Sequence, residues 1–544
     1  MEINTLFAEY PVTEEIPLKE YFGRSSQSKF RKASIKICVG LCAAMAMVLC
    51  GAVTAYADVG QMGFFGGYNE GKRLPKTTEL ILAETGAAKN NARRTETNAT
   101  VYKEMIALSG VMEEFEGLLT VKSTGDVTDK DQAGTYKVTY TVQPVKNAQG
   151  ALQIDRNIVF NVNWRKEGAQ VVKDYEAVSW RETIGDYSID LSQSHFNVSV
   201  LEDRTAGVTY YKGDVSMKAV YIANEAKIVK ETFGSLYGYD CAWSSTETHR
   251  LDTQIYGPDW QMNYQVRPSV SVNKTLQYSE NEPMAISFAG NYREVMSNQS
   301  GLQYNIFLQP PWNYDKPHQG SSTINSYNSF EQLIAPDTAF LKGHAAESDI
   351  NKLFSMGILM DIPTYYQPGQ AITRGQFVTM LVRAVKLPVE LPEKAPTTRN
   401  RKNVTVDVVF PDVSPDREDY PYIMAAYKAG LAVGRGNGHF YVDYSIQREE
   451  ALVLMLRTLG LSNLGLDPTP VTPFVDDADV SVWAKQDLYA AYKLGLIKPD
   501  SNGKIRPKEI ISKAEAAALV NHLIEYMRTG LQSDYTEHIV NYAK

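Results

Sequence analysis

The 544-residue chain has little cysteine, little histidine and no excess of positive charge. Four cysteines and seven histidines leave little material for a metal centre built from these ligands. Three of the cysteines, Cys38, Cys42 and Cys50, lie in one N-terminal apolar segment, so a chain processed after that segment keeps only Cys241 and no internal disulfide. The net charge of −8 argues against a dedicated nucleic-acid binder. We therefore expect no metal, no cofactor and no nucleic-acid partner.

The composition is that of a large folded protein. Hydrophobic residues make up 44% of the chain and charged residues 22%, which is typical of globular domains and excludes wholesale disorder. The length is enough for roughly three or four domains. The 33 tyrosines favour strands and wet surfaces over a dry enzyme core.

The N-terminal segment has the parts of a secretory signal. A basic cluster precedes an apolar run over residues 37–53, and Ala55 and Ala57 have the spacing of a cleavage site. The pattern predicts a signal peptide over 1–57 with a long polar leader, followed by a lead-in segment over 58–100. The alternative is an uncleaved anchor, because the apolar run is about long enough to span a membrane. In both cases we expect the rest of the chain to be extracellular.

The middle of the chain has the pattern of regular strands. Polar and apolar residues alternate over 135–142 and 157–164, and Gly, Asn and Asp separate such segments. This pattern predicts a β-sandwich module over 101–165 and a second β-rich module over 166–325. The stretch 126–142 resembles bacterial immunoglobulin-like surface modules. The fold class expected here is therefore all-β, with immunoglobulin-like sandwiches.

After the strands, the pattern becomes helical and repeats three times. In each repeat an apolar residue lies seven residues before a glycine, and a basic residue follows that glycine by 17 or 18 residues. The glycine should end a first helix, and the basic residue should lie at the start of a second helix. The glycines are Gly357, Gly430 and Gly495, and the basic residues are Arg374, Arg448 and Lys513.

The predicted helix starts are unusual places for cations. A basic side chain in the first turn opposes the helix dipole, so its presence there suggests a ligand. The alternative is an ion pair with a neighbouring acid inside the domain. Thr373 with Gln376, and Ser512 with Glu515, have the spacing of a capping box, which supports helix starts at these points.

The three repeats resemble S-layer homology domains. The resemblance covers residues 335–390, 404–462 and 470–530. It rests on Ile372-Thr-Arg-Gly-Gln-Phe377 in repeat 1, Phe410-Pro-Asp-Val413 in repeat 2, and Phe474-Val-Asp476, Trp483-Ala484 and Ile511-Ser-Lys-Ala-Glu515 in repeat 3. The family's tryptophan is present only as Trp483, and its places in repeats 1 and 2 hold Ala345 and Glu418.

The resemblance implies a mostly α-helical, pseudo-threefold triplet. It also implies non-covalent binding to a secondary cell-wall polysaccharide of Gram-positive-type bacteria, commonly one that carries ketal-linked pyruvate. A carboxylate-bearing sugar needs a cation and backbone donors, and we expect the helix starts to supply both. The binding residues implied are Arg374, Arg448, Lys513 and Trp483. Repeat 3 has lysine in place of arginine, which removes bidentate geometry there.

The function expected from these features is that of a non-enzymatic cell-surface protein of the S-layer type. The three C-terminal repeats would hold it to the cell wall, and the β region would project outward as a structural or adhesive part, with self-assembly in a surface layer. No catalytic constellation stands out in the sequence. Two alternatives stay open, a wall-anchored polysaccharide-active enzyme and a carbohydrate-binding protein, each with its site in the β region. An enzyme of this kind would need a pair of carboxylates in a cleft.

Overall fold

The computed structural model describes residues 59–60, 62–70, 94–108, 112–125, 132–144, 153–224, 226–279, 291–308, 318–389, 409–465 and 471–535. These residues belong to one compact unit, Thr54–Lys544. The predicted signal peptide and most of the predicted lead-in segment lie outside the described residues. Within the described ranges, no helix has both the length and the apolar character needed to cross a membrane.

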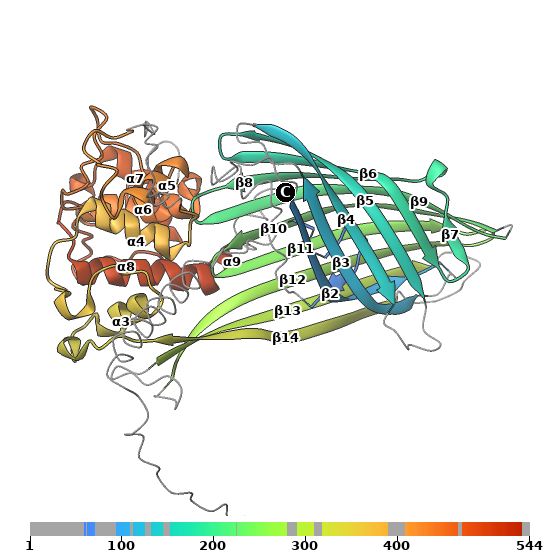
Figure 1. The fold of residues 1–544 in the computed structure, drawn as a ribbon, viewed down its shortest axis with the longest axis horizontal. Coiled ribbons are helices and arrows are strands. Elements are labelled where there is room, and N and C mark those ends of the chain that lie inside the picture. The colour runs from blue at the N-terminus through green and yellow to red at the C-terminus, as the bar shows by residue number, and fades with distance from the viewer. Residues whose placement is uncertain are drawn as a thin grey trace, which may run out of the picture. The chain divides into compact units, whose positions relative to one another are not determined.

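The first part of the described chain forms one antiparallel sheet of fourteen strands (Figure 1). Most strands pair with the next strand in the chain, and β8 pairs with both β6 and β9. The strands are β1 (Tyr68–Asn69), β2 (Arg94–Ile106), β3 (Glu113–Gly125), β4 (Ala133–Pro144), β5 (Ile154–Glu167), β6 (Gln170–Ile184), β7 (Tyr187–Ile189), β8 (His195–Arg204), β9 (Val208–Ala223), β10 (Ala226–Cys241), β11 (Ser244–Tyr256), β12 (Gln261–Ser279), β13 (Asn291–Leu308) and β14 (His318–Ile334).

The alternating pattern of the sequence explains the two faces of this sheet. In β4 the side chains of Tyr136, Val138, Tyr140 and Val142 are buried on one face, and the residues between them are exposed or half-buried. Successive side chains of a strand point to opposite faces, so a two-residue period buries one face of the sheet. The predicted strands at 135–142 and 157–164 are confirmed as parts of β4 and β5.

The expected immunoglobulin-like sandwich is not confirmed. A sandwich needs two packed sheets, whereas the described strands form one sheet in nearly sequential order. The expected division between residues 165 and 166 falls inside the β5–β6 hairpin, where Arg165 pairs with Val172 and Lys166 pairs with Val171. Alternation shows that a strand has one buried face, but it does not show what covers that face. The sequence pattern therefore predicted the strands and not their assembly.

The segment before β2 covers part of the buried face. The rings of Phe64 and Phe65 both contact Tyr140 of β4, Phe64 also stacks on His249 of β11, and Phe65 contacts Phe196 of β8. Because these strands are far apart in the sheet order, the sheet must curve around the segment. Polar contacts hold the segment as well: the Gly60 N–H donates to a Glu247 carboxylate oxygen at 3.1 Å, and the Tyr68 hydroxyl donates to Ser322 at 2.6 Å.

The rest of the described chain forms three helix pairs, one pair in each predicted repeat (Figure 1). Gly357, Gly430 and Gly495 follow the first helices with φ of 66°, 69° and 68°, which confirms the predicted left-handed helix ends. The predicted capping boxes at Thr373 and Ser512 are confirmed as well. The helices are α3 (Glu347–Ser355) and α4 (Arg374–Ala384) in repeat 1, α5 (Tyr420–Lys428) and α6 (Arg448–Leu459) in repeat 2, and α7 (Val482–Lys493) and α8 (Lys513–Glu525) in repeat 3, followed by a π-helical turn (Tyr526–Gly530) and α9 (Leu531–Asp534).

Side chains of the strands and of the turns between them bond carbonyl groups at or just after the C-terminal ends of the second helices. The last carbonyl groups of a helix have no partner within it and need donors from elsewhere. Here the sheet supplies them, so it and the repeats share one core, which contains the fully buried Trp243. The donors and acceptors are the Trp243 indole to Ala384 O (2.8 Å), the Thr205 hydroxyl to Thr458 O (3.0 Å), the Tyr210 hydroxyl to Leu459 O (2.9 Å) and the Ser244 hydroxyl to Met527 O (2.5 Å).

Candidate functional site: the junctions between the repeats

A closed ring of backbone hydrogen bonds joins the starts of α4, α6 and α8. The Ile372 N–H donates to Ile511 O at 3.1 Å, the Ile511 N–H donates to Ile446 O at 3.2 Å, and the Ile446 N–H donates to Ile372 O at 3.1 Å. All three isoleucine side chains are buried. The ring relates the repeats by a pseudo-threefold arrangement, which places Arg374, Arg448 and Lys513 at equivalent positions.

The first N–H groups of each second helix are used between repeats. The Arg374 N–H donates to Tyr444 O at 2.8 Å, and the Gly375 N–H donates to Val442 O at 3.0 Å. The other two helices repeat this arrangement. The N–H groups of Arg448 and Glu449 donate to the carbonyl oxygens of Glu509 and Pro507, and those of Lys513 and Ala514 donate to the carbonyl oxygens of Gln370 and Pro368. The expectation that these helix starts offer backbone donors to a ligand is therefore wrong. What each junction can offer a ligand depends on its side chains.

Arg374 is a buried cation that has no acidic partner among the described residues. Its side chain crosses from repeat 1 to repeat 2, where Nη2 donates to Val433 O at 3.1 Å and the guanidinium lies 5.1 Å from the Phe440 ring centroid. It is 6% exposed, its Nε has no hydrogen-bond partner, and no carboxylate among the described residues lies within ion-pair distance. Burial, with added repulsion from Arg435 and Arg457, lowers the pKa of Arg374 to about 10. We call this place the Arg374 junction.

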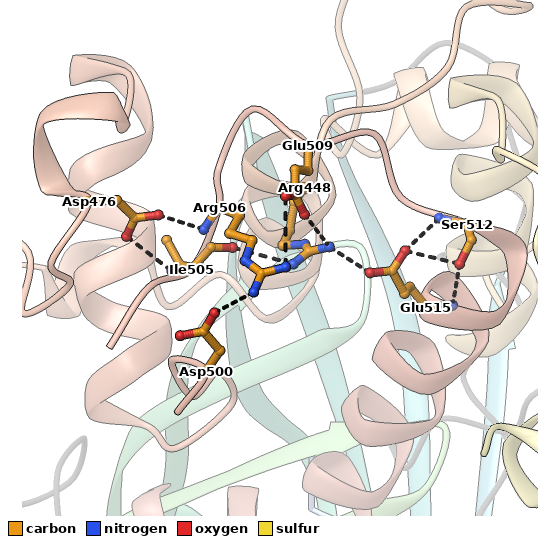
Figure 2. A network of polar contacts seen from close by, with 8 residues as sticks. All are labelled: Arg448, Asp476, Asp500, Ile505, Arg506, Glu509, Ser512 and Glu515. Carbon is orange, nitrogen blue, oxygen red and sulfur yellow. Dashed lines mark hydrogen bonds and ion pairs between the residues drawn. The ribbon is translucent and has the colours of Figure 1, made fainter. Parts of the chain in front are cut away.

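Arg448 occupies the equivalent position between repeats 2 and 3 and is neutralised there (Figure 2). Its Nη2 lies 2.6 Å from a Glu515 carboxylate oxygen and 3.5 Å from a Glu509 oxygen. Its Nη1 donates to Ile505 O at 3.4 Å. At this junction, which we call the Arg448 junction, the structure shows the intra-domain ion pair that was the alternative to a ligand.

Lys513 lies at the third equivalent position and is also paired. Its ammonium is 2.5 Å from an Asp361 carboxylate oxygen and 5.5 Å from the Tyr366 ring centroid. Lys513 lines a pocket of about 410 Å³ together with residues from repeats 1 and 2. We call this place the Lys513 junction. Here too the structure shows an ion pair inside the domain, which was the alternative to a ligand.

Trp483 is the second residue of α7, and half of its surface is exposed. It is therefore not a core residue packed between repeats. The position that it occupies in repeat 3 is held by Glu418 in repeat 2, and Glu418 lines the pocket at the Lys513 junction. The equivalent place in repeat 1, Ala345, is exposed.

Two aspartates hold the loops that the side chains of Arg374 and Arg448 reach. The sequence pattern had assigned these aspartates no role. Asp412 accepts hydrogen bonds from the N–H groups of Phe440 (2.8 Å) and Tyr441 (2.5 Å). Asp476 accepts from Ile505 (3.0 Å) and Arg506 (2.7 Å) in the same way (Figure 2). The signal was available, because both aspartates follow a phenylalanine by two residues in the repeated motif.

Comparison with known proteins agrees with this geometry. The model of the S-layer homology domain matches residues 341–378, 409–452 and 473–517. The C-terminal part of the chain carries three S-layer homology domains. Their presence indicates anchoring at the bacterial cell wall, and the protein is an extracellular cell-surface protein.

Relatives of the chain include both enzymes and surface-layer proteins. The chain is 30% identical over 266 residues to an amylopullulanase of Thermoanaerobacterium thermosulfurigenes (47% of this chain, 13% of that protein). It is 31% identical over 187 residues to the exoglucanase XynX of Acetivibrio thermocellus (34% and 16%). It is 28% identical over 179 residues to an S-layer protein of Bacillus licheniformis (33% and 18%). In each case the match covers less than a fifth of the relative's length.

Proposed function

We propose that the three S-layer homology domains hold this protein non-covalently to a secondary cell-wall polysaccharide, and that the Arg374 junction binds an acidic group of that polymer, such as ketal-linked pyruvate. The observation that supports this is the buried Arg374, a cation that meets no carboxylate among the described residues. A buried charge without a partner is costly, and an anionic ligand would remove that cost. A guanidinium also suits a carboxylate better than an ammonium does.

The other predicted binding residues take lesser parts in this proposal. Arg448 and Lys513 must exchange an existing carboxylate partner for the ligand, which weakens their contribution. Trp483, by pseudo-symmetry with Glu418 at the Lys513 junction, would lie beside the Arg374 junction. Its exposed indole could stack on a sugar ring there, since aromatic faces suit the apolar face of a sugar. We keep 335–390, 404–462 and 470–530 as the extents of the three repeats.

We further propose that the β region is a non-enzymatic structural or adhesive part and that copies assemble in a surface layer. Glu104 and Glu182 are a close carboxylate pair in that region, but both bind Arg156 at 2.6 Å and all three residues are at most 2% exposed. This arrangement is a buried ion-pair network and not an acid and base facing a cleft. A wall-anchored enzyme is the alternative, because relatives bear the names amylopullulanase and exoglucanase.

The anchoring proposal is tested by sedimentation of the full chain with purified cell walls, before and after removal of their polysaccharide. We expect retention on intact walls and its loss on stripped walls. Arg374→Ala should lower the apparent affinity by roughly tenfold or more, since a hydrogen bond to a charged group contributes about 1.5–3 kcal/mol. Arg448→Ala is the matched control, with an effect of less than roughly threefold expected because that arginine already has acidic partners.

Two results would contradict this proposal. Equal retention on intact and stripped walls would exclude the polysaccharide as the ligand. A tenfold loss of affinity with Arg448→Ala and no loss with Arg374→Ala would show that the acidic group binds at the Arg448 junction and not at the Arg374 junction. Circular dichroism of each variant before the assay ensures that a loss of retention reports binding and not unfolding.

A further inference from the structure

The strands at the two ends of the sheet differ in how far their outer edges are covered. At one end, the short β1 pairs with β2 at Tyr102 and Lys103, and the Glu70 N–H donates to Val101 O at 3.2 Å. At the other end, β14 forms the margin of the sheet and, among the described residues, pairs with β13 alone (Figure 1). The outer edge of β14 therefore presents backbone N–H and C=O groups that no described strand uses.

The sequence of β14 does not protect this edge. An unpaired strand edge is a template for another strand, and natural proteins usually blunt it with charged side chains, proline or a bulge. The strand at the other end, β2, carries Arg94, Glu96, Lys103 and Glu104. Residues 318–327 of β14, in contrast, include no Asp, Glu, Lys, Arg or Pro, and their register with β13 is regular. This edge is open to pairing with another strand.

A second copy of the same strand suits this edge. The side chains of Gln319, Ser321, Thr323 and Asn325 are exposed, and all four are polar and uncharged. In an antiparallel pair about a twofold axis, each copy presents the same stretch to the other, so an uncharged stretch brings no like charges together. Serine, threonine and asparagine side chains can also hydrogen-bond across such a pair. The stretch 318–327 is long enough for a paired length of roughly 34 Å.

We infer that β14 pairs edge to edge with β14 of a second copy, so that one antiparallel sheet continues across two copies. This inference rests on the proposed assembly of copies, for which it names one contact surface. A twofold contact closes on itself, so it gives a pair and not a filament. Because β14 leads directly into repeat 1, antiparallel pairing places the two sets of repeats at opposite ends of the joined sheet, and the pair presents two anchors to the wall.

The first test is sedimentation velocity of the full chain over a series of concentrations, which measures the fraction of paired copies. The variant Ser321→Lys with Asn325→Lys puts two charges beside the outer edge. It should raise the Kd of the pair by roughly tenfold or more, because like charges across a strand pair are destabilising. The matched control is Gln303→Lys with Gln299→Lys. These exposed glutamines lie opposite Ser321 and Asn325 on β13, whose edges are both paired, so the control should leave the Kd unchanged.

Hydrogen exchange of the same proteins locates the contact. The backbone amides of residues 318–327 should exchange more slowly as the concentration of the native chain rises, because pairing adds hydrogen bonds at the outer edge. The control should show the same change, and the variant with Lys at 321 and 325 should not. Slow exchange that does not depend on concentration would show that the chain covers this edge itself, and would overturn the inference.

The other outcomes separate this inference from the proposals on which it builds. A chain that stays monomeric throughout the series would overturn the pairing. Association that the β14 variant leaves intact, or that the control weakens equally, would overturn the β14 contact and leave assembly through another surface. Wall retention is measured separately: retention of a monomeric chain leaves the anchoring proposal intact, and a paired chain that no wall retains would support the β14 contact and contradict anchoring.

Discussion

The Arg374 and Arg448 junctions have the same backbone and opposite electrostatics. Both arginines begin their helix with the same pair of N–H donors to the neighbouring repeat, and both side chains reach a loop that an aspartate holds. The guanidinium of Arg374 is buried and meets no acid within the part of the chain that the structure describes, whereas that of Arg448 lies between two carboxylates. Backbone hydrogen bonds do not depend on side-chain identity. The ring can therefore keep the pseudo-threefold arrangement while the chemistry of each junction diverges.

The largest effect should come from the part that the two junctions share. Ile372→Ala and Ile446→Ala each remove a fully buried side chain at the ring, so each should lower the free energy of unfolding by about 2–5 kcal/mol. Chemical denaturation of the full chain measures both. Because the two isoleucines occupy equivalent positions in the ring, the two decreases in the free energy of unfolding should agree within about 1 kcal/mol. A large loss at one position and almost none at the other would show that the ring is not equally important at both junctions.

Much of this ring could be predicted from the sequence, because it depends on local signals. The glycines that end the first helices, the capping residues Thr373 and Ser512, and the positions of the three cations are set by neighbours within a few residues in the chain. Short-range signals of this kind survive in any tertiary context that keeps the helices.

The partners of the cations could not be predicted in this way. Arg374 meets Val433 after 59 residues, Arg448 meets Glu515 after 67, and Lys513 meets Asp361 after 152. Nothing in the spacing of charges decides which acid a pseudo-symmetric ring brings to which cation. The same limit applies to the β region, where alternation predicted the strands and long-range pairing decided that they form one sheet.

Replacing each arginine by methionine should separate the two junctions by the sign of the effect on stability. Burial lowers the pKa of Arg374, so the folded state disfavours its charged form, and this cost is present at every pH below about 10. Arg374→Met should therefore raise the free energy of unfolding at neutral pH by about 1 kcal/mol, although it should weaken wall retention. Arg448→Met leaves only half-exposed carboxylates behind and should change stability by no more than about 0.5 kcal/mol.

Thermal and chemical unfolding of the two methionine variants under the same buffer conditions measures this difference. Arg448→Met serves as the control for the loss of a long side chain at this position. If Arg374→Met proves destabilising by as much as a buried ion pair does, Arg374 must have a partner in solution, and the argument for an anion site at that junction loses its basis.

The smallest effect should come from making the Arg448 junction more like the Arg374 junction. Glu515→Gln removes the closer carboxylate, while glutamine can still complete the capping box, as Gln376 does in repeat 1. The pair is partly exposed, so the loss of stability should be below about 1 kcal/mol. Arg448 would then face only Glu509 at 3.5 Å, and wall retention should rise by roughly twofold, since a like-charged competitor of the ligand is gone.

Glu509→Gln, which removes the more distant carboxylate, is the matched control and should raise retention less. A fall in retention with Glu515→Gln would mean that the Glu515 carboxylate itself contacts the polymer, which would contradict its part as a competitor of the ligand.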